Sequence, residues 1–106
     1  MGLAVYLSED GETVYSANIT HNLNKMAEAA GIYKHLWRPE EIGITKAHQL
    51  IEPLLDGYRK LVLEHTEMQQ YNSPNGWGMY AHFLPFVTEY IEACAANPNA
   101  DVEVSR

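Results

Sequence analysis

Residues 3–16 read LAVYLSEDGETVYS and decide how the fold begins. Two apolar, β-prone runs flank Asp10-Gly11, and this dipeptide is the usual signal of a tight turn between antiparallel strands. The stretch therefore predicts a β-hairpin with strands at 2–8 and 12–17.

The other end of the chain supplies a third strand. Residues 101–105 read Asp-Val-Glu-Val-Ser, and such alternation of polar and apolar side chains is typical of a half-buried strand. The hairpin is the partner that the sequence offers to this strand. We therefore expect the three strands to form a small antiparallel sheet.

The segment after the hairpin carries apolar residues at helical spacing and predicts a helix over 21–30. Thr20 can cap its start and Gly31 can end it in a left-handed conformation. Residues 32–39 are expected to form a connection rich in large side chains. Pro39 is expected to begin a brief helix, because proline suits the first helical position.

Two longer helices follow in the prediction. Residues 45–66 hold a helical stripe, with Thr45 as a candidate cap, and form either one helix kinked at Pro53 or two helices that abut. Residues 76–96 predict a last helix, which Pro85 should bend.

Length and composition bound the fold and the function. The 106 residues predict a single α+β domain, 1–106, in which three main helices cover the small sheet. With 14 acidic and 7 basic side chains the net charge is −7, which argues against non-specific binding to nucleic acids. No apolar run is long enough to span a membrane and no signal peptide is evident, so we expect a cytoplasmic protein without membrane contact.

Composition and size also bear on metal clusters, cofactors and oligomerisation. Cys94 is the only cysteine, so a thiolate metal cluster is excluded, and no cofactor is predicted. A homo-oligomer is expected, because a shared interface adds buried area to a small chain that is rich in aromatic residues.

The first cluster of candidate site residues lies where the hairpin meets the first helix. It comprises Thr20, His21 and Asn22, with Lys25 close behind. Free N–H groups and positive dipole potential at a helix start favour an anion such as a phosphate. Alternatively, these side chains simply cap the backbone.

The second cluster is Trp37-Arg38, a pair that can stack a base and hold a phosphate. In the alternative, Trp37 is a core anchor and Arg38 pairs with Glu40 or Glu41. Residues 21–38 carry three basic side chains and one acidic side chain, so this is the one basic stretch of an acidic chain.

The third cluster is Asn75-Gly-Trp77-Gly-Met-Tyr80. Two glycines around a tryptophan are costly inside a helix. Their presence indicates close approach of the backbone to a ligand or to a neighbouring element. We take Asn75, Trp77 and Tyr80 as candidate ligand-binding residues, and packing against the first helix is the alternative.

A metal site has little support in the sequence. His48 and Glu52 are spaced i, i+4 on one predicted helix face and are weak candidate ligands. The chain has no HExxH or CxxC motif, and such side chains on an exposed helix are usually only solvated. We therefore predict no metal site and no catalytic residues.

Several short sequence motifs are similar to those of a known group of proteins. Asn18-Ile-Thr-His-Asn-Leu23, Leu36-Trp-Arg-Pro39 and Asn75-Gly-Trp-Gly78 resemble a group of small proteins encoded by bacteriophages and prophages, over nearly the whole chain from residue 13 onward. The resemblance implies a phage protein that acts in a bacterial cytoplasm. It brings no catalytic residues to these positions.

These observations favour a binding protein rather than an enzyme. The leading hypothesis is a phage protein that holds a small anionic, nucleotide-derived ligand between the three clusters and so sequesters a defence signal of the host. One alternative is an interaction or accessory protein that binds a host or phage protein. Another is a small metal-dependent hydrolase that uses His48 and Glu52.

Overall fold

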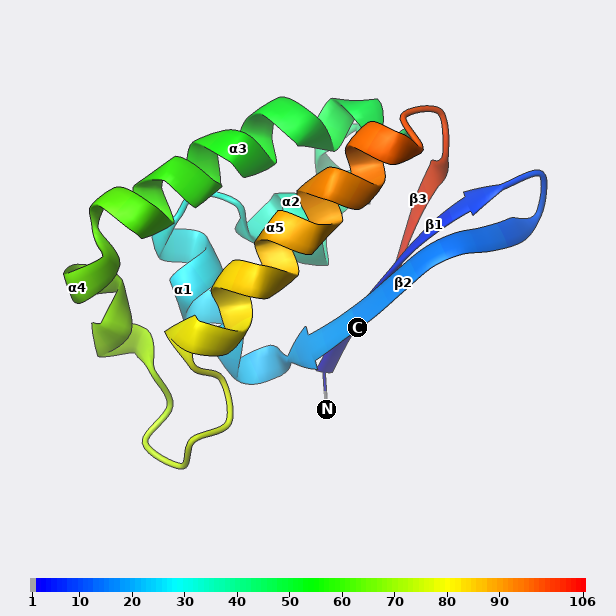
Figure 1. Cartoon of the computed structure of the whole chain (residues 1–106). Coiled ribbons are helices and arrows are strands. Elements are labelled where there is room, and N and C mark those ends of the chain that lie inside the picture. Colours follow the sequence, from blue (N-terminus) through cyan, green and yellow to red (C-terminus); the bar gives the residue numbers. More distant parts are fainter. Residues whose placement is uncertain (1) are drawn as a thin grey trace.

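The computed structural model describes residues 2–106 and has the predicted α+β architecture. Three antiparallel strands form one sheet in the order β2-β1-β3, and Figure 1 shows the helices on one side of this sheet. The predicted hairpin and the C-terminal strand are both confirmed. The strands are β1 (Gly2–Glu9), β2 (Glu12–Thr20) and β3 (Asp101–Ser105).

Side-chain alternation decides which face of the sheet is covered. Leu3, Val5 and Leu7 of β1 are fully buried, whereas their neighbours along the strand are not. Their cross-strand partners therefore share the covered face. These partners are Ile19, Ala17 and Tyr15 on β2, and Val104 and Val102 on β3. The hairpin turns at Asp10 and Gly11, which both have positive φ, as a tight turn of this kind requires.

Three main helices, α1, α3 and α5, provide most of the helical layer. α3 and α5 pack against each other, and α5 also packs against β2 (Figure 1). None of the helices within residues 2–106 is long and apolar enough to cross a membrane. The helical elements are η1 (His21–Leu23), α1 (Asn24–Ala29), α2 (Tyr33–Trp37), η2 (Pro39–Ile42), α3 (His48–Leu63), α4 (His65–Met68), η3 (Gln69–Tyr71) and α5 (Tyr80–Ala96).

The end of α1 follows the sequence signal. Gly31 has φ 80°, its N–H donates to the carbonyl oxygen of Glu28, and the N–H of Ile32 donates to that of Ala27 at 2.9 Å. This is the Schellman pattern that a glycine after a helix predicts. The connection expected over 32–39 is wrong in part, because α2 forms there and buries Leu36 and Trp37.

The start of α3 corrects the predicted cap. The helix begins at His48 rather than at 45, and the Thr45 side chain does not cap it. Instead, Oε1 of Gln49 accepts hydrogen bonds from the backbone N–H groups of Thr45 and Lys46, each at 2.8 Å. α3 then runs continuously through Pro53, and the separate α4 begins two residues after it ends.

The last helix is shorter than predicted. α5 begins at Tyr80, not at 76, because Gly76 and Gly78 have φ values of 79° and 105°, which no right-handed helix can contain. The glycines therefore belong to a loop. This loop positions the third cluster.

Candidate functional site

The first and third clusters lie against each other. Nδ2 of Asn22 donates a hydrogen bond to the backbone carbonyl oxygen of Trp77 at 3.0 Å, across 55 residues of sequence. Gly78 is buried beside them, and a Cβ atom at this position would lie 2.9 Å from Cβ of Asn22 and 3.2 Å from Cγ2 of Thr20. The close approach predicted from the glycines is therefore made by a neighbouring element.

The loop around Trp77 is held by its own asparagines. Oδ1 of Asn75 accepts from the backbone N–H of Trp77 at 3.0 Å and also from the Ser73 hydroxyl. Oδ1 of Asn72 accepts from the backbone N–H of Tyr80 at 2.6 Å. These bonds fix the backbone of the loop, yet the Trp77 side chain remains 70% exposed.

Tyr80 anchors the loop from the other side. Its hydroxyl donates to the carbonyl oxygen of Leu61 in α3 at 2.8 Å, and its side chain is half-buried. Burial raises the pKa of this phenol, so it remains a neutral hydrogen-bond donor. Tyr80 thus joins α5 to α3.

Two surface depressions adjoin at Trp77. The first, which we term the junction hollow, has a volume of about 790 Å³ and is lined by Ala4, His21, Asn22, Asn75 and Ser105 among others. The second, the β2–α5 groove, has a volume of about 390 Å³ and is lined by Tyr15, Ala17, His82, Pro85, Phe86 and Glu89 among others. Asn18, Ile19, Thr20 and Trp77 line both.

His21 has a fixed orientation at the rim of the junction hollow. Its Nδ1 accepts a hydrogen bond from Nε1–H of the buried Trp37 at 3.1 Å, and the two rings meet edge to face. An imidazole that accepts at Nδ1 carries its hydrogen on Nε2 when neutral. The exposed edge of His21 therefore presents an N–H donor.

The Trp37-Arg38 cluster does not line either depression. Trp37 is fully buried and stacks on Tyr33 with ring centroids 5.4 Å apart. The Arg38 guanidinium forms an ion pair with Glu41 at 3.2 Å. This arrangement matches the alternative in which Trp37 is a core anchor and Arg38 pairs with an acid.

The basic stretch is partly neutralised within the fold. Lys34 also lies near Glu41, at 3.6 Å. Lys25 is exposed on α1 and forms no ion pair with any of residues 2–106. It lies one helical turn after Asn22.

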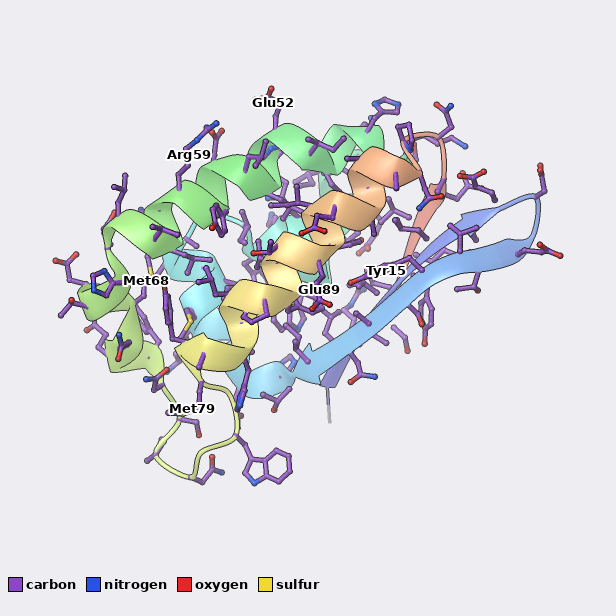
Figure 2. The ribbon with its side chains drawn as sticks, in the orientation of Figure 1. Tyr15, Glu52, Arg59, Met68, Met79 and Glu89 are labelled. Carbon is purple, nitrogen blue, oxygen red and sulfur yellow. The ribbon has the colours of Figure 1, made fainter. Side chains whose placement is uncertain are left out.

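The weak metal-ligand candidates lie on α3, and the single cysteine lies on α5. Within residues 2–106 no three His, Cys, Asp or Glu side chains gather in one place. His48 and Glu52 are exposed on α3, and Figure 2 shows Glu52 directed away from the rest of the molecule. Cys94 is buried, which raises the pKa of its thiol to about 12 and keeps it protonated.

The β2–α5 groove contains residues that sequence reasoning missed. Figure 2 shows Tyr15 and Glu89 in the space between β2 and α5. Burial, followed by the charge of Glu89, raises the pKa of the Tyr15 phenol. A polar stripe at His82 and Glu89, one on each side of Pro85, could have indicated a groove along this helix.

Comparison with known protein families, with curated proteins and with solved structures finds no match for this chain.

Proposed function

We propose that this chain is a small phage-encoded binding protein that holds a nucleotide-derived ligand in the junction hollow. The observation that carries the proposal is Trp77. Its indole is 70% exposed, although its backbone is fixed by hydrogen bonds from Asn22 and to Asn75. A large aromatic ring exposed to water on a hydrogen-bonded backbone is the kind of surface that planar ligands stack on.

The lining of the hollow suits a nucleobase. Asn18, Asn22 and Asn75 supply amide groups, which both donate and accept hydrogen bonds. Stacking of a base on an aromatic side chain contributes about 1–3 kcal/mol. A base stacked on Trp77 with polar groups at its edge is therefore the pose that this lining favours.

The negative charge of the ligand is matched by the start of the helical region. His21 lines the hollow and presents an N–H donor, and Lys25 follows one helical turn later. In a chain of net charge −7, His21 in the lining and the exposed Lys25 that follows it in sequence are the groups that favour a phosphate. Sequestering such a molecule in the cytoplasm of a bacterial host is the role that fits a small non-catalytic protein.

Native mass spectrometry of the untagged protein from a bacterial host tests the proposal. We expect an additional non-covalent mass of a few hundred daltons per chain that is lost on denaturation. Trp77→Ala should abolish this mass while changing Tm by less than about 2 °C, because the side chain packs against little. Leu63→Ala, at a side chain that is 81% exposed outside both depressions, is the matched control.

Calorimetric titration distinguishes the contribution of the phosphate to binding from that of the nucleoside. Nucleoside monophosphates should bind more tightly than the corresponding nucleosides, and Lys25→Gln should remove this difference while Lys60→Gln retains it. A bare chain mass together with no heat from either class of compound would refute the proposal.

A further inference from the structure

The outer edge of β2 is unpaired. Within residues 2–106, the strand order β2-β1-β3 gives the nine-residue β2 a strand partner on one side only. The other edge of the sheet is covered at the beginning of β3. There, Lys46 pairs with Asp101, and the N–H of Val102 donates to the carbonyl oxygen of Thr45 at 2.9 Å.

This edge lacks the usual protection. Native edge strands commonly carry lysine, proline or a central bulge that blocks pairing with a further strand. β2 contains neither residue, and its one charged side chain is Glu12 at its beginning. The single irregularity lies opposite Leu7 and Ser8, near the hairpin, so residues 15–20 continue in regular register.

A groove runs beside the same strand. Ala17 and Ile19 of β2 and Pro85 and Phe86 of α5 give the β2–α5 groove an apolar lining, and Trp77 lies at its rim. Its volume of about 390 Å³ is sufficient for a few side chains. An edge strand with a groove between it and a helix is the arrangement by which many domains bind extended peptides: the backbone pairs with the strand, and alternate side chains enter the groove.

The charge of the groove selects the partner. Glu89 lines the groove. Burial, and after it the negative charges of Glu89 and Glu92, raise the pKa of the Tyr15 phenol. No lysine or arginine lines the groove. A basic side chain is therefore the complement, and the indole of Trp77 can also receive a cation on its face.

We propose that β2 accepts an extended, lysine- or arginine-bearing segment of another protein as a fourth strand, with a basic side chain of that segment next to Glu89. A second copy of this chain fits less well, because it would bring the same acidic groove and a net charge of −7 against itself. This interaction goes beyond the proposed ligand binding and does not depend on it.

Peptide titration tests the inference. The probe is a blocked peptide of about ten residues that alternates lysine with valine, long enough to span β2. We expect it to bind, to shift the backbone amide resonances of residues 15–20 in heteronuclear spectra, and to slow hydrogen exchange along this edge. The same peptide methylated at every backbone nitrogen has no backbone N–H donor on either edge and should not bind.

Charge reversal at Glu89 is the second test of the inference. Glu89→Lys should weaken binding of the lysine peptide about tenfold and should improve binding of a peptide that alternates glutamate with valine. Glu52→Lys makes the same charge change on α3, away from the groove, and should have no effect. Both variants alter exposed side chains, so their folding is checked by an unchanged Tm.

Three outcomes of the peptide titrations would overturn the inference. They are absence of binding, binding that survives N-methylation, and binding that is equal for wild type and Glu89→Lys. A stable dimer with protected β2 amides in the absence of peptide would also overturn it, in favour of self-association. None of these outcomes affects the nucleotide titrations, which report on the junction hollow.

Discussion

Two polar atoms lie buried without a hydrogen-bond partner among residues 2–106: Nδ1 of His35 and the hydroxyl oxygen of Tyr90. In both residues burial disfavours the charged form. It raises the pKa of Tyr90, so this phenol stays neutral between Tyr15 and Phe86, on which its ring packs. It lowers the pKa of His35 below the ordinary 6.5, so the imidazole also stays neutral at neutral pH.

His35 predicts a pH dependence of stability. Because its pKa is lower in the folded chain than in the unfolded chain, its contribution is complete above pH 6.5 and is lost as the pH falls through the folded pKa. The unfolded chain binds the extra proton in this range, so the free energy of unfolding decreases on acidification. His35→Gln should flatten the decrease below about pH 6.5 in urea titrations. His48→Gln, at an exposed position, should leave it intact; equal slopes for both variants would contradict the assignment.

At the scale of elements, the loop between η3 and α5 depends on one glycine more than on the other. Both Gly76 and Gly78 have positive φ, but a Cβ at position 76 meets nothing within 4 Å, whereas at 78 it meets Asn22 at 2.9 Å. Gly76→Ala therefore carries only the cost of a left-handed backbone, about 1 kcal/mol.

Gly78→Ala adds a steric conflict with the junction to the same backbone cost. We expect it to lower the free energy of unfolding by about 2–3 kcal/mol, clearly more than Gly76→Ala does. The Asn22–Trp77 hydrogen bond should lengthen or break. Urea denaturation of the two variants measures the difference in the free energy of unfolding. Equal losses would show that the residues around Gly78 accommodate a Cβ atom at little cost.

These elements also show what sequence signals can and cannot predict. The Asp10-Gly11 turn and the Gly31 stop are local, because each depends on the backbone conformation that one or two residues prefer, and both are confirmed. α2 depends on burial of Trp37 and Leu36, and burial is decided by the rest of the fold. The start of α5 was misplaced because apolar spacing continued through two glycines that cannot be helical.

At the scale of the whole molecule, the candidate site was predicted in part. The Thr20–Asn22 junction and the Trp77 loop lie against each other. Both could be recognised in the sequence because capping residues mark the junction and glycines mark the loop. Arg38 was grouped with them on the basis of residue type and local positive charge, yet its guanidinium pairs with Glu41 three residues away. The β2–α5 groove was missed because it depends on which hairpin strand β3 joins, and alternation of side chains does not specify that choice.

Among the side-chain hydrogen bonds of residues 2–106, one made by Arg106 spans the most sequence. Its Nη1 donates to the carbonyl oxygen of Trp37 at 2.8 Å, across 69 residues, and its guanidinium lies 3.1 Å from the Glu40 carboxylate. Arg106→Ala should lower the free energy of unfolding by about 1 kcal/mol, because the carbonyl loses its donor and the exposed ion pair adds little. Glu40→Gln tests the ion pair alone and should cost less than half as much in the same urea titration. A larger loss for Glu40→Gln would assign the stabilisation to charge.

The position of β1 in the middle of the sheet has a consequence for synthesis on the ribosome. β1 can pair with β2 as soon as both are translated, but its other edge waits for residues 101–105, which follow all the helices in the sequence. Until β3 is made, the hairpin therefore has two open edges and an apolar face that α5 covers only late. A nascent chain of this protein is most exposed to misassociation before β3 leaves the exit tunnel, and β1 gains its second partner in one late step.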